Sequence, residues 1–237
     1  TGDDGSEVTD TVDSTDPVAT FGGLVAGVSY TLAEADEAGW TEGSFACVVT
    51  HADGTTTDVT GSFTVAPGDA IACGITNVAL PGAVEITKDV AGLADGTPWG
   101  PFSFTLIGDD TSERTATVDS TNPVGTFDGL VAGVAYTLSE DDLAGWTQGE
   151  FTCVITHADG TTTDATGTFT VAPGDAIACG ITNTAVPADV EVTKSVEGVA
   201  DGFDWAFEFA ISPVPAGASS PQVASGTGEG TATVGWT

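Results

Sequence analysis

The sequence repeats itself with a period of 106 residues. The run FTVAPGDAIACGITN occurs at 63–77 and again, unchanged, at 169–183, and THADGTTTD occurs at 50–58 and at 156–164. A repeat of about 100 residues is as long as a common independent domain, so each copy can bury its own core. The repeat therefore predicts tandem modules rather than a solenoid of short units that depend on one another.

The copies differ in which segments they contain. Residue 1 aligns with residue 107, so the first copy has no counterpart of the segment that carries Lys88. The last copy supplies that segment again, with Lys194, and then diverges in sequence. We expect a first module without its first strand at 1–81, a complete module at 82–186 and a truncated third module at 187–237. We also expect the chain to be an excerpt of a longer protein.

Strand signals dominate the complete copy. Short runs rich in Val, Ile, Thr and Phe alternate with clusters of Gly, Asp, Pro and Ser, and no stretch has a helical period. The pattern predicts strands near 83–90, 101–107, 113–119, 125–128, 133–140, 149–157, 165–171 and 176–184. The pair Asp159-Gly160 predicts a hairpin between 149–157 and 165–171, and the Pro/Ala/Ser/Gly-rich stretch 213–230 predicts a loop. We expect an all-β fold of tandem immunoglobulin-like or prealbumin-like β-sandwich modules.

The charge balance excludes several classes of partner. Three basic residues against 35 acidic ones give a formal net charge of −32. Nucleic acids and anionic membrane surfaces bind through clustered Lys and Arg, so neither is expected to bind. The sequence has no EF-hand or other calcium repeat and no apolar run of membrane length. We therefore expect no metal, no cofactor and no membrane insertion.

The four cysteines form two equivalent pairs, Cys47 with Cys73 and Cys153 with Cys179, each 26 residues apart. They lack the spacing of a zinc site. Paired cysteines without a metal pattern favour disulfides and an oxidising, extracellular location. Buried free thiols are the alternative.

Three polar residues of the complete copy fall on the inward phase of their strands. Because side chains alternate between the two faces of a strand, Lys88 shares a face with Val84 and Ile86. The same rule places Glu140 with Leu138, and Asn183 with Ile181. In the other copies Glu34, Asn77 and Lys194 occupy the equivalent positions. We therefore expect Lys88, Glu140 and Asn183 to meet inside the module.

Side chains of these three types, buried together, can react with one another. Burial disfavours the charged forms of an amine and a carboxylic acid, and a neutral amine is a nucleophile. Attack of Lys88 Nζ on Asn183 Cγ would form an isopeptide bond and release ammonia, with Glu140 carrying the protons. The structural alternatives are a snorkelling edge lysine, an asparagine that ends a strand and a solvated glutamate. His51 and His157 occur once per module with no evident partner and are not expected to be catalytic or metal-binding.

The motifs resemble those of Cna B-type (SpaA-like pilin) domains of Gram-positive surface proteins. The resemblance rests on a first strand ending in Thr-Lys at Lys88 and Lys194, the segment GVAYTLSEDDLAGW at 133–146, and a last strand ending in GITN. It covers 83–185 fully and implies that Lys88 bonds Asn183, assisted by Glu140. Two departures are the absence of a proline at 142–144 and the presence of a cysteine pair.

These expectations lead to a structural function. We expect an extracellular stalk, adhesin shaft or pilus segment that is not an enzyme and whose partners are neighbouring modules. A module that binds a glycan or a host protein is the alternative, with its ligand unknown. A third hypothesis is a filament in which Lys194 of one chain bonds Asn77 of another, so that incomplete end modules complete each other.

Overall fold

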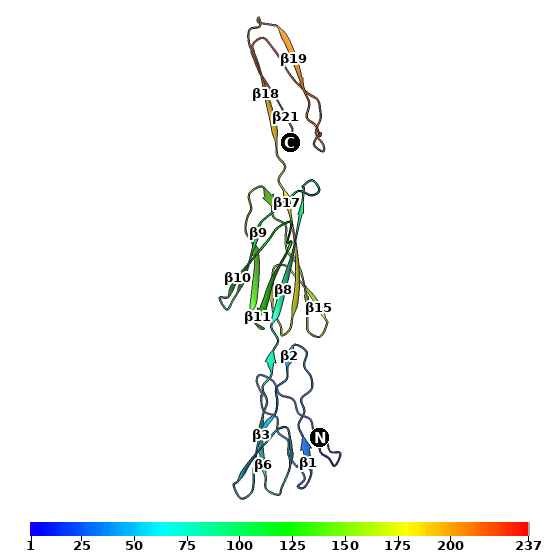
Figure 1. Cartoon of the computed structure of the whole chain (residues 1–237), viewed down its shortest axis with the longest axis vertical. Helices are drawn as coiled ribbons and strands as arrows, with labels where there is room; N and C mark the ends of the chain where they lie inside the picture. Colours follow the sequence, from blue (N-terminus) through cyan, green and yellow to red (C-terminus); the bar gives the residue numbers. More distant parts are fainter. Residues whose placement is uncertain (237) are drawn as a thin grey trace. The chain divides into compact units, whose positions relative to one another are not determined.

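A computed structural model describes residues 1–236, which form 21 β-strands and no helix (Figure 1). The described chain divides into two compact units. One comprises Thr1–Lys88, Gly100–Asp141 and Glu150–Ile181, and the other Asp89–Trp99, Asp142–Gly149 and Thr182–Thr237. The expected all-β fold is confirmed. The units do not follow the repeat, so the module boundaries at 81 and 186 stay a prediction.

Two sheets make up the complete copy. The first is four-stranded, in the order β10 (Glu113–Val118), β9 (Phe102–Gly108), β12 (Ala135–Glu140) and β16 (Thr168–Thr170). The second has the order β11 (Val124–Leu130), β8 (Gly82–Ala91), β17 (Ala176–Ala185), β14 (Thr152–Thr156) and β15 (Thr162–Ala165), with β13 (Trp146–Thr147) also on β17. The first and last long strands of this copy, β8 and β17, are therefore sheet neighbours.

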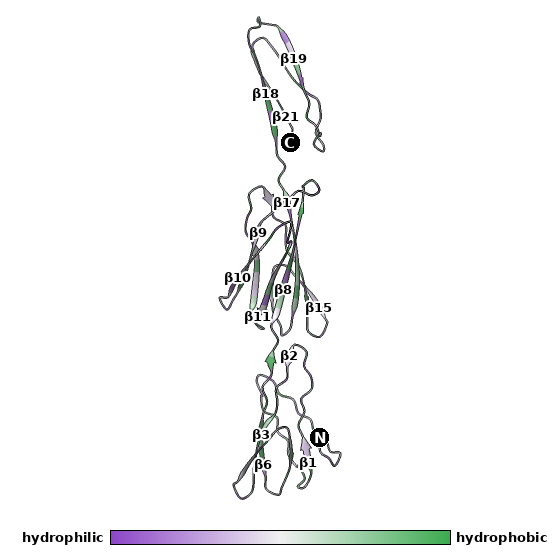
Figure 2. Cartoon of the chain, in the orientation of Figure 1, coloured by the Kyte–Doolittle hydropathy of each residue, from purple (hydrophilic) through white to green (hydrophobic). Residues whose placement is uncertain are grey.

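The core of this copy is built by strict alternation along its strands. In β8, Val84, Ile86 and Lys88 are buried while Glu85 and Thr87 are exposed. The strands β12 and β17 alternate in the same way, with Glu140 and Asn183 at buried positions. Figure 2 shows hydrophobic and hydrophilic residues interleaved along these strands. The predicted strand phases are confirmed.

One predicted hairpin has a different partner strand. The turn at Asp159-Gly160 does follow β14, but β14 pairs with β15 rather than with a strand over 165–171. The chain then crosses to the other sheet, where β16 pairs with β12. The turn signal at Gly167, which has a φ of 68°, divides what looked like one strand into two.

The first copy contains seven short strands, which are β1 (Ser29–Thr31), β2 (Trp40–Thr41), β3 (Ala46–Thr50), β4 (Thr56–Val59), β5 (Ser62–Thr64), β6 (Ala70–Gly74) and β7 (Val78–Ala79). They form the sheets β1-β5, β4-β3-β6 and β2-β7. A small core of Tyr30, Val49, Phe63 and Val65 lies within this copy.

Two segments that form strands in the complete copy are irregular in the first copy. Residues 7–12 and 18–24 are equivalent to β10 and β11, yet they lie outside any strand. In the complete copy β10 pairs with β9 and β11 pairs with β8, whereas the described residues include no equivalent of β8 and only residues 1 and 2 of the equivalent of β9. Burial differs between the copies as well, because Cys179 is 4% exposed whereas its equivalent Cys73 is exposed to solvent.

The last copy forms two hairpin-like pairs. The strand β18 (Val190–Val196) pairs with β21 (Gly230–Trp236), and β19 (Asp204–Phe209) pairs with β20 (Gln222–Thr227). The prediction of a loop over 213–230 is therefore wrong from Gln222 onward. Small residues are needed in β20 because Gly226 lies opposite Trp205, where an added Cβ would approach the indole ring to 2.7 Å. Loop-like composition here reflects packing against a tryptophan.

Candidate functional site

Lys88 lies at a fully enclosed position on β8. Its side chain is 0% exposed, its Nζ atom lies 2.9 Å from Glu140 Oε1, and it sits 4.5 Å from the centre of the Phe102 ring. Its backbone N–H donates to Pro123 O. A buried ammonium is tolerated only with a partner of opposite charge and further polar contacts. Lys88 is therefore a core residue and not a snorkelling edge lysine.

Glu140 ends β12 and completes the pair. Its side chain is also 0% exposed, and it continues the buried row of Tyr136 and Leu138. Tyr136 fixes this row, because its hydroxyl accepts a hydrogen bond from the Val131 backbone N–H at 3.1 Å. The packing places an acid–base pair in an apolar interior, where electrostatic interactions are stronger than in water.

Asn183 occupies a buried position near the end of β17 and is 2% exposed. Its Oδ1 atom accepts a hydrogen bond of 3.2 Å from the Gly149 backbone N–H. A Cβ atom on Gly149 would lie 2.3 Å from Thr182 O, so only glycine brings this N–H close enough. A backbone donor on a carboxamide oxygen stabilises the negative charge that develops there during nucleophilic attack.

The first copy contains the same asparagine arrangement without a lysine. Gly43 N donates to Asn77 Oδ1 at 3.2 Å, and Asn77 Nδ2 donates to Glu34 Oε2 at 2.9 Å. A Cβ on Gly43 would again meet a strand carbonyl, Thr76 O, at 2.1 Å. Sequence analysis missed both glycines, although the 106-residue shift relates them.

The equivalent glutamates of the two copies contact a lysine amine and an asparagine amide. Glu140 contacts the amine of Lys88, and Glu34 contacts the amide nitrogen of Asn77. Because the two positions are equivalent in the repeat, a carboxyl group at this place reaches both the nucleophile and the leaving group. That geometry suits a group that carries a proton between them.

Lys194 has a different environment. It is half-buried on β18, its Nζ atom donates to Ser195 O at 2.9 Å, and it lies 4.5 Å from the centre of the Phe207 ring. The inward phase predicted for Lys194 holds in part, since Val192, Lys194 and Val196 are all half-buried.

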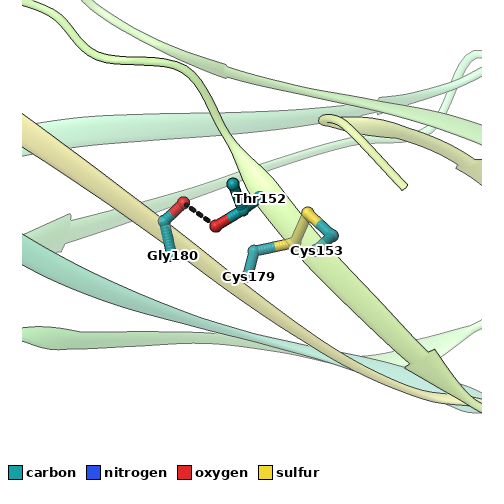
Figure 3. The surroundings of a disulfide bond; sticks show 4 residues. All are labelled: Thr152, Cys153, Cys179 and Gly180. Atoms are coloured by element: carbon teal, nitrogen blue, oxygen red, sulfur yellow. Dashed lines mark hydrogen bonds between the residues drawn. A yellow bond between two sulfur atoms is a disulfide. The ribbon is translucent and has the colours of Figure 1, made fainter. Parts of the chain in front are cut away.

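Both cysteine pairs form disulfides, as predicted. Cys47 bonds Cys73 and Cys153 bonds Cys179. In each copy the two cysteines lie directly opposite each other on paired antiparallel strands. Figure 3 shows the bond between β14 and β17, with Thr152 Oγ1 donating to Gly180 O beside it. Each disulfide fixes the register of a strand pair.

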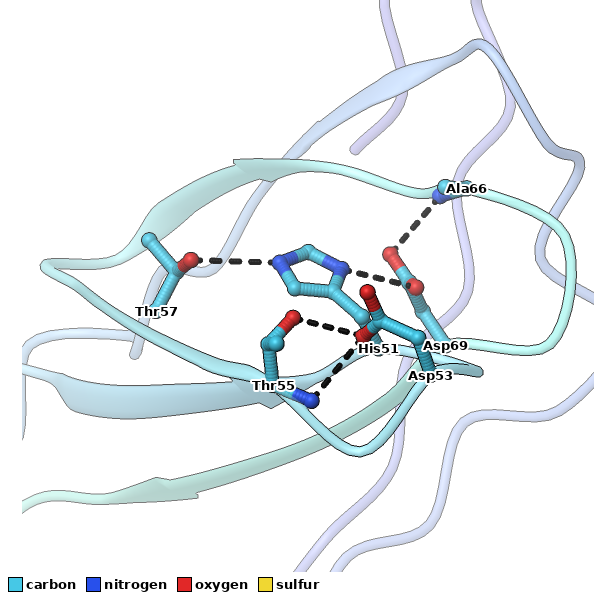
Figure 4. Close-up of polar contacts among 6 residues, drawn as sticks. All are labelled: His51, Asp53, Thr55, Thr57, Ala66 and Asp69. Carbon is cyan, nitrogen blue, oxygen red and sulfur yellow. Dashed lines mark hydrogen bonds and ion pairs between the residues drawn. The ribbon is translucent and has the colours of Figure 1, made fainter.

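The histidines have partners that sequence analysis missed. His51 Nδ1 lies 3.0 Å from Asp69 Oδ1, and His51 Nε2 lies 3.1 Å from Thr57 Oγ1 (Figure 4). The side chain of Asp69 is 1% exposed, and the Ala66 N–H donates to its other oxygen at 2.9 Å. This Ala66 hydrogen bond, together with the one from His51, holds the pKa of Asp69 below its usual value.

The same arrangement recurs in the complete copy, where His157 lies between Asp175 and Thr163. The sequence signal was available, because the repeat relates all three residues. Among residues 1–236, no group of three or more histidine, cysteine or acidic side chains is placed to hold a metal ion. No helix within the same residues has the length and apolarity needed to cross a membrane.

Two family models match the chain in succession. Both describe a prealbumin-like fold domain of the SpaA type, one over residues 2–75 and the other over residues 84–185. A search of curated proteins gives no match.

Solved structures of bacterial surface proteins are also similar. The T3.2 major pilin of Streptococcus pyogenes is 15% identical, with a TM-score of 0.36 over 67% of this chain and 66% of that chain. The T-13 major pilin of the same species is 16% identical, with a TM-score of 0.38 over 70% and 69%. An adhesin from Mobiluncus mulieris, which contains disulfide, isopeptide and ester cross-links, is 12% identical, with a TM-score of 0.32 over 61% and 87%. The chain thus spans about two thirds of the length of the two pilins. Sequence identities and TM-scores this low do not carry a function over to this chain.

Proposed function

Because the chain belongs to the SpaA-type prealbumin-like domain family, we propose that it is a shaft segment of a bacterial surface pilus or adhesin. In this proposal the complete module is closed by an isopeptide bond between Lys88 and Asn183. Its location is extracellular, in keeping with two disulfides, which persist in oxidising surroundings. Its partners are neighbouring modules.

The proposed reaction needs no cofactor. Glu140 takes a proton from Lys88 Nζ, and the neutral amine attacks Asn183 Cγ. The Gly149 N–H stabilises the oxygen of the tetrahedral intermediate. Glu140 then gives its proton to the amide nitrogen, the Cγ–Nδ2 bond breaks and ammonia leaves. The carboxylate of Glu140 takes the second proton of the attacking nitrogen, which leaves a neutral isopeptide N–H. One C–N bond forms and one breaks, so the complete module reacts once, and in this proposal the chain is not an enzyme.

The observation that carries this proposal is the position of the glutamate in the two copies. It contacts the amine in one copy and the leaving nitrogen in the other. A purely structural ion pair would explain the contact with Lys88, but it would not explain why the equivalent Glu34 binds the asparagine amide.

The position of the bond in the fold gives it a mechanical role. The chain enters the complete copy along β8 and leaves along β17, and these strands are sheet neighbours. A covalent bond from Lys88 to Asn183 would carry a pulling force directly from one strand to the other. The residues between them would then bear no load, as a shaft under tension requires.

Intact mass measurement of the oxidised chain tests the proposal. We expect a mass lower than that of the disulfide-bonded sequence by one ammonia, and a proteolytic fragment in which Lys88 and Asn183 are joined. Lys88→Ala should abolish the loss. The matched control, Lys194→Ala, should keep it. A wild-type mass without the loss, after prolonged incubation of the folded chain, would refute the bond.

A further inference from the structure

We propose that Thr57 and Thr163 are acyl-acceptor hydroxyls, each activated by its own histidine and aspartate, which take acyl groups from activated esters or thioesters. In the complete copy Asp175 Oδ1 lies 2.8 Å from His157 Nδ1, and His157 Nε2 lies 3.2 Å from Thr163 Oγ1. A hydroxyl, a base and a group that orients the base, in hydrogen-bond sequence, is the arrangement of an activated nucleophile.

The buried aspartate fixes how the imidazole is protonated. The Asp175 side chain is 0% exposed, and its second oxygen accepts the Ala172 N–H at 2.7 Å. A carboxylate accepts hydrogen bonds only, so the Nδ1 atom of His157 must carry the proton that faces it. In the neutral ring, Nε2 is then an acceptor, and it faces the Thr163 hydroxyl. The imidazole is therefore set to remove the hydroxyl proton.

The reacting end is open to a ligand. Thr163 lies on the exposed strand β15, and the His157 side chain is 28% exposed. Side-chain exposure increases in the same order in the first copy, where Asp69 is 1% and His51 35% exposed and Thr57 lies on the exposed strand β4. In both copies the hydrogen-bonded aspartate, histidine and threonine therefore lead from a buried carboxylate to an accessible hydroxyl.

Neighbouring threonines have other hydrogen bonds, which makes the assignment specific. Thr161 Oγ1 donates to Asp159 Oδ1 at 2.6 Å, and Thr55 Oγ1 donates to Asp53 Oδ1 at 2.6 Å. Those hydroxyls bind a carboxylate and close a turn, whereas Thr57 and Thr163 face an imidazole nitrogen. Within one short Thr-rich hairpin, only the last threonine of the run meets a base oriented by a carboxylate.

The reaction is a simple acyl transfer. Thr163 Oγ1 attacks the acyl carbon, its proton passes to His157 Nε2, and the bond from the acyl carbon to the leaving oxygen or sulfur breaks. The leaving group takes the proton from the imidazolium, and an ester of threonine remains. General-base assistance contributes about 10²–10⁴-fold, so the expected donors are already activated.

The folded 237-residue chain with p-nitrophenyl acetate as probe tests this. We expect acetyl esters on Thr57 and Thr163 at rates on the order of 10²-fold above those on Thr56 and Thr162, located by tandem mass spectrometry. Hydroxylamine cleaves esters but not amides, so it separates these products from acetylated lysines and the N-terminus.

Matched variants use one copy as the control for the other. Thr163→Val should remove the label from the complete copy and leave Thr57 labelled, and Thr163→Ser should restore it. His157→Gln should reduce labelling of Thr163 to the level of Thr162. Equal labelling of all exposed threonines, labelling confined to amines, or hydrolysis of the probe without any threonine ester would overturn the proposal. If His157→Gln disturbs folding, the Thr163→Val variant still tests the proposal, because labelling of Thr57 in the same molecule serves as the internal control.

Discussion

Asn77 Nδ2 donates a hydrogen bond of 2.9 Å to Glu34 Oε2 in a copy that has no counterpart of Lys88. The amide and the carboxyl group are therefore brought together by the rest of the module and not by the lysine. In the complete copy the equivalent carboxyl group is paired with the lysine at the same distance, 2.9 Å. A site arranged before its nucleophile arrives suits a reaction that depends on proximity.

Replacing Glu140 with glutamine should prevent the cross-link. The variant can no longer take the proton from Lys88, and the buried ammonium loses its counter-charge, which costs about 3–5 kcal/mol in comparable buried pairs. Intact mass should show no loss of ammonia, and the thermal midpoint should fall. Glu34→Gln is the matched control and should keep the loss of one ammonia relative to its own sequence mass. A fully cross-linked Glu140→Gln chain would exclude the proton-carrying role.

Gly149→Ala should slow the cross-link without removing a reacting group. Its Cβ would lie 2.3 Å from Thr182 O, so the loop must move and the N–H that binds Asn183 Oδ1 is withdrawn. Loss of one such donor costs about 10²–10³-fold in rate where it stabilises an oxyanion. The measurement is the time course of ammonia loss after refolding. Gly43→Ala introduces the same clash in the first copy and should leave that time course unaltered.

Lys88→Ala should make the complete copy extensible under force. Without the bond, pulling would unfold the strands between β8 and β17 except for the loop closed by Cys153–Cys179, a gain in length on the order of 20 nm. Atomic force spectroscopy of the oxidised chain measures this step. The wild-type chain should lack the step, and its presence at full amplitude would contradict the proposed load path.

The two disulfides should differ in their rates of reduction. Cys73 is exposed on β6, which pairs with β3 on one edge only, whereas Cys179 on β17 lies between β8 and β14 and is 4% exposed. A thiolate reductant reaches an exposed sulfur sooner. Timed dithiothreitol treatment, alkylation and peptide mapping should show Cys47–Cys73 opening first. Equal rates would mean that burial in the folded state does not control access.

Asp69 should stabilise the first copy at neutral pH and not in acid. Its pKa is lowered by the Ala66 N–H and by His51, so the folded state binds its proton less readily than the unfolded state. The contribution is therefore present above the unfolded pKa of about 3.9 and is lost as the pH falls through the folded value. Thermal melts of Asp69→Asn and of the wild type should converge toward low pH. Asp58→Asn, on the exposed strand β4, is the control.

The sequence predicted the local part of this architecture well. A two-residue period in β8, β12 and β17 was enough to place Lys88, Glu140 and Asn183 on buried faces, since alternation is a property of the extended backbone. It failed where composition conflicted with packing. The glycine and serine content of β20 resembles a loop, but Gly226 is required by the indole ring of Trp205.

The sequence by itself determined the repeat, the strand phases and the set of polar residues that must be buried. Only the tertiary structure decided which residues meet, namely Lys88 with Glu140, Gly149 with Asn183 and His157 with Asp175. The physical reason is that periodicity fixes the face on which a side chain lies. The neighbours on that face come from other strands and loops, and their order is set by the packing of the whole sandwich.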